Sequence, residues 1–394
     1  MDLIGWVIFI VALLFSVMLH ETGHFVMAKK FGMKVTRYFV GFGPTIWSIW
    51  RGETEYGIKA LPLGGFVKIT GMTSVDEVDP EDEPRSFREH PAWQRIVVLA
   101  AGSFMHFVLA FLLIFGLALG IGIENTTQLS SISPCVAANL TQLDNGVCTK
   151  SDPESPAKLA GLQVGDQVIA FDGKPMSNWT QLSDAIEAAP VGSHATITVL
   201  RSSKTVTLHA TLASVSKRPG AFLGIAEVAF QSASPWRAVT YSGSAIEQVI
   251  VGSAKAVAAL PAALPKDFGK DRGNTVGGQV SSIYGAAQAT GAAVAANVGW
   301  QYKVSFVLLL IASLNIFVGA LNLLPLLPLD GGHIAVVIWE RIRAWFARLR
   351  GRPDPGLVDI TKLVPVSFSI FLVLMCLSVA LVLADIVNPV NIAG

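Results

Sequence analysis

The chain has 394 residues, of which 52% are hydrophobic and only 14% are charged, and its 29 basic and 28 acidic side chains leave a formal net charge of +1. A nucleic-acid-binding protein carries an excess of basic residues and a disordered chain is richer in charged residues, so the composition excludes both classes.

Four stretches of the chain contain no Asp, Glu, Lys or Arg, namely Leu3 to Leu19, Ile96 to Ile123, Val304 to Leu329 and Leu363 to Ala384. Crossing a ~30 Å hydrocarbon core takes about 20 apolar residues in a helix, and only the first stretch falls slightly short of that length. A cleaved signal peptide is the alternative for this first stretch, but no basic residue precedes it and no small-residue cleavage site follows it. We therefore predict a polytopic α-helical membrane protein with four transmembrane helices.

Basic residues flank three of these stretches on what should be one side of the membrane: Lys29, Lys30, Lys34 and Arg37, then Arg85, Arg88 and Arg95, then Arg341, Arg343, Arg348, Arg350 and Arg352. Because loops rich in Lys and Arg stay in the cytoplasm, we expect these segments to be cytoplasmic in a multi-pass protein of the cell membrane. The long segment between the second and third helices would then be extracytoplasmic.

The first helix ends in the sequence His20-Glu21-Thr22-Gly23-His24, which reads H-E-x-x-H. Residues i and i+4 share a helix face, so both imidazoles can bind one zinc ion while Glu21 acts on a water molecule. The alternative is a histidine pair that is hydrogen-bonded within a helix bundle. Ionisable side chains at membrane depth are costly unless a metal or partner satisfies them, which favours a metal site.

A catalytic zinc ion normally has three protein ligands, and Asp330 follows the third stretch, two residues after Pro328 and five after Pro325. Prolines break a helix, and irregular backbone is tolerated in a membrane only where it is buried in protein or lines a wet cavity. Asp330 is therefore the candidate third ligand.

The two motifs H-E-x-G-H-F (His20 to Phe25) and N-x-x-P-x-x-P-L-D-G-G (Asn322 to Gly332) together resemble the paired signature of the site-2 protease family of intramembrane zinc metalloproteases. The resemblance implies one Zn²⁺ per chain bound by His20, His24 and Asp330, with Glu21 as the general base. It also implies that Asn322 contacts the substrate. In the second stretch, Ser103 and His106 depart from the family pattern, and we expect His106 to hydrogen-bond to another helix.

Residues 31–72 alternate apolar and polar side chains, which predicts short strands with turns at Gly41 to Pro44 and at Gly64-Gly65. The segment resembles the family's membrane-associated β-hairpin region, and Gly64, Gly65 and Phe66 are its candidate substrate-binding residues. A strand edge can hold an unwound substrate by strand addition. A sheet that rests on lipid headgroups through Trp47 and Trp50 is the alternative.

Residues 151–231 carry Ser155-Pro156-Ala157 and other short motifs in the order of a PDZ domain, which is α+β, and Leu223, Gly224 and Ile225 are placed as its peptide-binding loop. The domain either binds peptides or excludes substrates that keep a large outer domain. Cys135 and Cys148, which precede it, are candidates for a disulfide, whereas Cys376 should be a buried thiol. The tract after it fits either an interfacial helix, broken at Pro261 and Pro265, or a linker.

The predicted segments are transmembrane helix 1 (1–30), the β-hairpin region (31–72), a cytoplasmic loop (73–95), transmembrane helix 2 (96–123), an extracytoplasmic linker (124–150), the PDZ domain (151–231), a helical segment (232–302), transmembrane helix 3 (303–330), a cytoplasmic loop (331–362) and transmembrane helix 4 (363–387). The resemblance implies a zinc endopeptidase that cleaves the transmembrane segments of single-span membrane proteins, such as anti-sigma factors or remnant signal peptides. No nucleic-acid partner is expected. The alternatives are a non-catalytic membrane PDZ scaffold that holds partner proteins and a transporter, although no second broken helix supports the latter.

Overall fold

The computed structural model describes residues 3–72, 76–122, 127–136, 148–149, 152–215, 220–228, 230–267, 282–296 and 299–387. Most of the predicted linker 124–150 lies outside these residues. The chain forms two compact units, residues 1–116 with 239–394 and residues 117–238. Each unit is described by itself.

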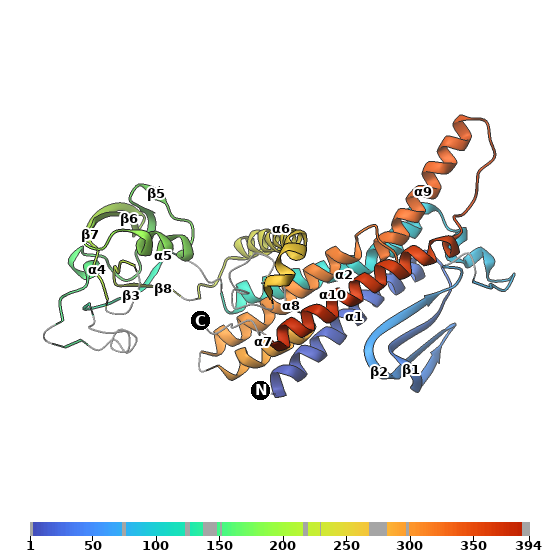
Figure 1. The fold of residues 1–394 in the computed structure, drawn as a ribbon, viewed down its shortest axis with the longest axis horizontal. Coiled ribbons are helices and arrows are strands. Elements are labelled where there is room, and N and C mark those ends of the chain that lie inside the picture. Colours follow the sequence, from blue (N-terminus) through green and yellow to red (C-terminus); the bar gives the residue numbers. More distant parts are fainter. Residues whose placement is uncertain are drawn as a thin grey trace. The chain divides into compact units, whose positions relative to one another are not determined.

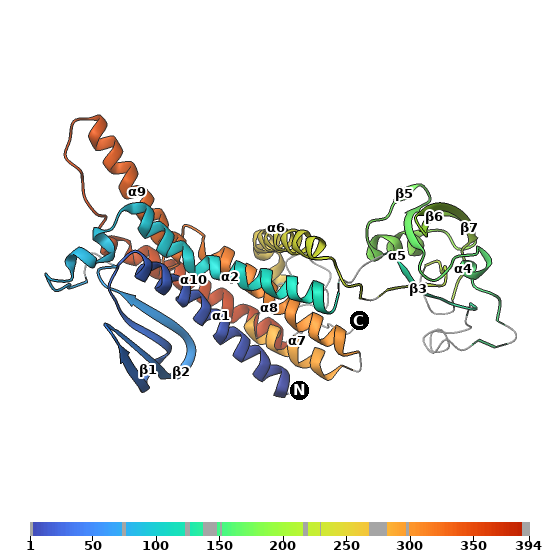
Figure 2. The same ribbon diagram turned by 180° about the vertical axis from the view of Figure 1, so that it is seen from behind.

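Four helices in the larger unit are long and apolar enough to cross a membrane: α1 (Leu3–Lys30), α2 (Ala92–Gly120), α8 (Trp300–Asn322) and α10 (Val364–Val387). They lie side by side as a bundle in both views (Figures 1 and 2). A further helix, α7 (Ile283–Ala295), packs along α1, where Gly5 lies so close to Gly291 that a Cβ on Gly5 would come within 2.6 Å of the Gly291 Cα. These contacts fix α1 in the bundle.

The segment after α1 is a long hairpin that folds back on itself. Strand β1 (Val35–Arg51) pairs antiparallel with β2 (Thr54–Ile69), and the chain turns at residues 51–54. Residues 37–40 of β1 pair both with 65–68 and with 55–58 of β2, whereas residues 45–51 pair with 54–59. Each long strand therefore reverses direction along its length, β1 near residues 41–44 and β2 near residues 59–64. The predicted turns at Gly41 to Pro44 and at Gly64-Gly65 lie at these reversals. Two short 3₁₀ helices, η1 (Glu83–Arg85) and η2 (Phe87–Glu89), follow before α2.

Four expectations are corrected in the larger unit. The third span ends at Asn322, and the segment expected as a cytoplasmic loop contains helix α9 (Asp330–Leu349), followed by the 3₁₀ helix η4 (Ile360–Leu363). Helix α6 (Pro235–Asp267) continues through Pro261 and Pro265 instead of breaking there. Cys376 is exposed rather than buried, because it lies on an outward face of α10.

The smaller unit is an α+β fold. Its four-stranded antiparallel sheet has the order β5-β4-β6-β7 and is built from β4 (Gln167–Phe171), β5 (Lys174–Pro175), β6 (His194–Arg201) and β7 (Lys204–Thr211). Strand β3 (Leu129–Ile132) pairs with β8 (Ile225–Glu227), and the helices are α4 (Pro156–Leu159) and α5 (Trp179–Ala188). Its core packs Leu182 of α5 with Ile197 and Val199 of β6. Cys135 and Cys148 form a disulfide.

Candidate metal centre

The two motif histidines lie on one face of α1, as the i, i+4 spacing predicts. Both His20 and His24 are buried, and their Nε2 atoms are 3.1 Å apart. Between them, Gly23 lies against the backbone of Ala101 in α2, so that a Cβ at this position would come within 2.7 Å of the Ala101 carbonyl carbon. The glycine therefore allows α1 and α2 to approach closely at the level of the histidines.

The backbone of α2 fixes the protonation of His24. Nδ1 of His24 lies 2.8 Å from the carbonyl oxygen of Val98. A carbonyl oxygen can only accept a hydrogen bond, so Nδ1 must carry the proton. In the neutral ring, Nε2 then presents a lone pair toward His20, which is the state that a metal ligand requires.

Asp330 reaches the histidines because the chain folds back on itself between α8 and α9. The prolines end regular helix after Asn322, and Asp330 is the first residue of α9. The segment between α8 and α9 lies tightly against the first turn of α9, since a Cβ on Gly332 would come within 2.6 Å of the Leu327 amide nitrogen. The glycine pair that follows Asp330 is thus required by this close approach.

The three side chains form a compact cluster of possible metal ligands. Oδ2 of Asp330 lies 3.3 Å from His20 Nε2 and 3.4 Å from His24 Nε2. Tetrahedral zinc with bonds of about 2.0 to 2.1 Å separates its ligand atoms by about 3.3 Å. Within the described part of the chain, Oδ2 is buried without a hydrogen-bond partner. Such an orphaned oxygen, placed at zinc ligand distances from two imidazoles, fits a metal-binding role.

Glu21 is held by the β-hairpin. The backbone N–H of Val67 in β2 donates a hydrogen bond to Glu21 Oε2 at 2.9 Å. Nearby, a Cβ on Gly65 would lie 2.7 Å from Met18 Sδ and 3.5 Å from Glu21 Cγ. The hairpin therefore lies directly against α1 at the motif, and its glycine makes room for that contact.

Two features that hold the cluster in place were not predicted from the sequence, namely the packing of Gly102 on the histidine rings and a buried hydrogen-bond chain. A Cβ on Gly102 of α2 would lie 2.6 Å from His24 Cε1 and 2.7 Å from His20 Cε1, and closer still to His24 Nε2. No local pattern reveals this, because the contact joins segments about 80 residues apart.

The other support is a buried hydrogen-bond chain across three helices. Asn315 of α8 donates through Nδ2 to Ser16 Oγ at 3.0 Å and to Ile311 O at 2.8 Å, and its Oδ1 lies 2.8 Å from His106 Nδ1. The expectation that His106 bonds to another helix is confirmed. Its ring lies 5.1 Å from the His20 ring, centroid to centroid, so the chain ends beside the cluster.

The candidate substrate-binding residues divide between the two units. Phe66 is half-buried and stacks on Phe39 with ring centroids 5.6 Å apart, and Asn322 is half-buried at the last position of α8. In the smaller unit, Leu223, Gly224 and Ile225 line a cavity of about 40 Å³ opposite Trp179 and Ser183 of α5. A groove between a strand edge and a helix is where PDZ domains bind peptides.

Comparisons with known proteins cover nearly the whole chain. The sequence model of Peptidase family M50 matches residues 8–352. Zinc metalloprotease Rip1 of Mycolicibacterium smegmatis is 37% identical over 99% of this chain and 98% of its own length. Zinc metalloprotease Rip1 of Mycobacterium tuberculosis is 36% identical over 98% of each chain.

Among solved structures, the PDZ domain of an SdrC-like protein from Listeria innocua covers 27% of this chain and 99% of its own, with 19% identity and a TM-score of 0.20. A TM-score of this size does not establish a shared fold. The PDZ identity of the smaller unit therefore stays a prediction.

Proposed function

The chain belongs to Peptidase family M50, the site-2 proteases, and is an intramembrane zinc metalloprotease; we propose that His20, His24 and Asp330 bind its zinc ion and that Glu21 is its general base. The observation that carries this proposal is the cluster of three ligand atoms at the separations of a zinc tetrahedron. The non-catalytic scaffold alternative is set aside because the relatives that match the whole chain are zinc metalloproteases.

Bound zinc supplies Lewis acidity, which polarises a peptide carbonyl and acidifies water. The chain's own residues prepare the site for it. Val98 holds His24 in the tautomer with a lone pair at Nε2, and Val67 holds the Glu21 carboxylate in one orientation. Glu21 takes up a proton from the attacking water and returns it to the leaving amide nitrogen.

The substrate in this proposal is the transmembrane segment of a single-span protein, such as an anti-sigma factor or a remnant signal peptide. A helix hides its peptide groups in internal hydrogen bonds, so it must be unwound before cleavage. The Val67 N–H points out of the hairpin toward Glu21, and by strand alternation the backbone of Gly65 faces the same edge. That edge of β2, with Gly64 and Phe66, would hold the unwound chain by strand addition beside Glu21. Asn322 would contact the substrate backbone.

The proposed orientation places the histidine end of α1 at the cytoplasmic side and the smaller unit outside. The basic residues that flank the spans support this orientation. The Cys135–Cys148 disulfide also supports it, because disulfides persist in oxidising compartments. Outside the membrane, the groove at Leu223, Gly224 and Ile225 would bind a peptide end or the unit would exclude uncut substrates.

The test uses the full chain in proteoliposomes with a single-span substrate whose outer domain is absent. Mass spectrometry should locate the cut within the apolar segment of the substrate, and a zinc chelator should abolish cleavage. Asp330→Ala should lower bound zinc well below one ion per chain, whereas His333→Ala, on the same helix but outside the cluster, should retain it. Chelator-resistant cleavage, a cut only outside the apolar segment, or unchanged zinc in Asp330→Ala would overturn the proposal.

A further inference from the structure

Helix α9 has an apolar face that no other described element covers. Ile338, Trp339, Trp345, Phe346 and Leu349 are all exposed, Trp339 and Trp345 by 55% each. At ~100° per residue, Ile338, Ile342, Trp345, Phe346 and Leu349 fall within an arc of roughly 100° on the helix. A contiguous exposed apolar face of this kind marks an interaction surface.

Arginines border this face on both sides. On the same helical wheel, Arg341 and Arg348 lie along one border, and Arg343 and Arg350 lie along the other. An apolar arc between two rows of basic side chains is typical of a helix at the surface of an anionic membrane. An acidic protein partner would satisfy the arginines but would not need aromatic side chains between them.

The opposite face of α9 packs on α2 at the edge of the apolar span. Glu340 is buried and forms an ion pair with Arg95 of α2 at 2.9 Å. Arg95 is the last charged residue before the apolar run of α2, so Glu340 lies where the hydrocarbon core ends. Phe346 follows six residues later, about 9 Å along the helix. Ile338 precedes Glu340 by two residues, so the exposed face begins about 3 Å inside the hydrocarbon edge and runs through the headgroup layer, which is about 5 to 8 Å thick on each side.

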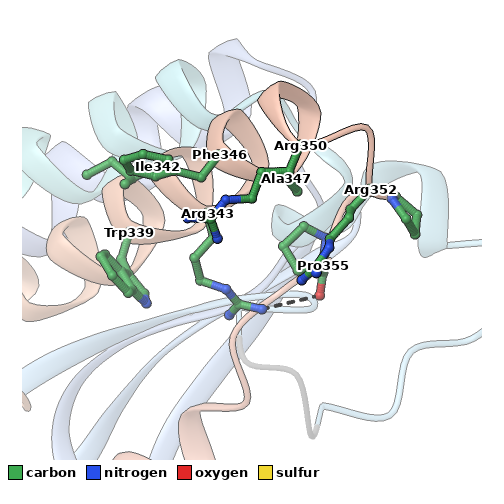
Figure 3. A pocket seen from close by; sticks show the side chains of 9 residues that line it. Trp339, Ile342, Arg343, Phe346, Ala347, Arg350, Arg352 and Pro355 are labelled. Atoms are coloured by element: carbon green, nitrogen blue, oxygen red, sulfur yellow. Dashed lines mark hydrogen bonds between the residues drawn. The ribbon is translucent and has the colours of Figure 1, made fainter.

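A cavity of about 420 Å³ lies on one border of this face (Figure 3). Its walls combine Trp339, Ile342, Phe346 and Arg343 of α9 with Arg350, which caps the C-terminus of the helix, and Arg352 closes it from the returning segment. Arg343 also donates to the carbonyl oxygen of Pro355 at 3.4 Å, which holds that segment against the helix. None of the residues that line the cavity is acidic. Asp354, which lies between two of the lining prolines, instead accepts a hydrogen bond from the Gly356 N–H at 2.9 Å.

We propose that this cavity binds the headgroup of an anionic phospholipid, with its phosphate held by Arg343, Arg350 and Arg352 and its acyl chains lying along Trp339 and Phe346. Arginine presents several donors that match phosphate geometry, and the aromatic side chains suit the boundary between headgroup and hydrocarbon. The site is independent of the zinc cluster. It would fix α9, whose first residue is Asp330, against the membrane surface.

The test measures lipid binding to the full chain in detergent micelles by native mass spectrometry. Dioctanoyl phosphatidylglycerol is titrated against wild type, against Arg343→Gln/Arg350→Gln, and against the control Arg341→Gln/Arg348→Gln, which removes the same charge outside the cavity. Two basic contacts near a membrane surface correspond to about a 30-fold change in affinity. We expect a loss of about that size in the first variant and less than about threefold in the control. If the double variant does not fold, Arg352→Gln, outside the helix, should still weaken binding about fivefold.

Dioctanoyl phosphatidylcholine and inorganic phosphate complete the titration. Weaker binding of both supports a site for an anionic lipid. The proposal would be overturned if both double variants lost the same affinity, or if phosphatidylcholine or inorganic phosphate bound as tightly as phosphatidylglycerol. Preferential binding of a polyglutamate peptide would also overturn it, in favour of an acidic protein partner.

Discussion

Replacing Gly102 by alanine should disable the metal centre without changing any of its proposed ligands. The added Cβ would lie 2.6 Å from His24 Cε1 and 2.7 Å from His20 Cε1. Carbon atoms in ordinary contact are about 3.5 to 4.0 Å apart, so the imidazoles or α2 must shift by about 1 Å. The rings cannot move freely, because His24 is also hydrogen-bonded to Val98. A displacement of about 1 Å in a catalytic group costs about 100-fold in rate.

The assay compares zinc affinity and cleavage rate for wild type, Gly102→Ala and Gly116→Ala in the same proteoliposomes. Gly116 lies on the same helix, and a Cβ there would meet nothing within 4 Å, so this control carries the same change in helix propensity. We expect Gly102→Ala to lose about 100-fold in cleavage rate and to bind zinc more weakly, and Gly116→Ala to match wild type. Normal zinc affinity and rate in Gly102→Ala would refute the reasoning that α2 packs on the ligand pair.

The remaining predictions concern the supports of the site. Asn315→Leu leaves the buried Nδ1 of His106 without its partner, which should cost about 1 to 3 kcal/mol of stability in thermal unfolding and weaken zinc binding in a zinc titration. The control Ser313→Ala removes a hydroxyl that is bonded only within α8, so it should change neither measurement. Equal effects of the two substitutions would contradict a role for the Asn315 hydrogen-bond chain. Hydrogen bonds from Arg85, followed by those from Lys29, lower the pKa of Glu53 at the hairpin turn from 4.5 to about 2. Because the folded-state pKa lies below the unfolded one, this contribution is complete above about pH 4.5 and is lost as the pH falls toward 2. Since Glu53 is partly exposed, Glu53→Gln should cost only about 1 kcal/mol at pH 7 and almost nothing at pH 2 in thermal unfolding, and a difference that persists at pH 2 would exclude the ion pair as its source.

The metal cluster could be predicted from the sequence because its geometry is largely local. The i, i+4 spacing places His20 and His24 on one face, and the proline-rich approach to Asp330 marks a break in the third span. The spans themselves follow from uninterrupted apolar runs. The roles of Gly102 and Asn315 could not be predicted in this way, because each depends on which distant helix packs beside it.

The hairpin and α9 differ in what the sequence could reveal. In the hairpin, glycine and proline mark the reversals near Gly41 to Pro44 and Gly64-Gly65, but no local pattern indicates that residues 37–40 pair with 55–58 as well as with 65–68. For α9 the signal is present in the sequence, since Ile338, Ile342, Trp345 and Leu349 recur at helical spacing. The prediction of a cytoplasmic loop rests on the basic residues, which indicate the side of the membrane and not the secondary structure.

The most direct test of the proposed chemistry is cleavage by Glu21→Gln. Glutamine keeps the shape of the side chain and can still accept the Val67 N–H, but it cannot take up a proton at catalytic pH. In proteoliposomes with a single-span substrate, we predict that Glu21→Gln binds one zinc ion per chain, as wild type does, and shows no detectable cleavage. Cleavage by Glu21→Gln at the wild-type rate, with the same zinc content, would contradict the assignment of Glu21 as the general base.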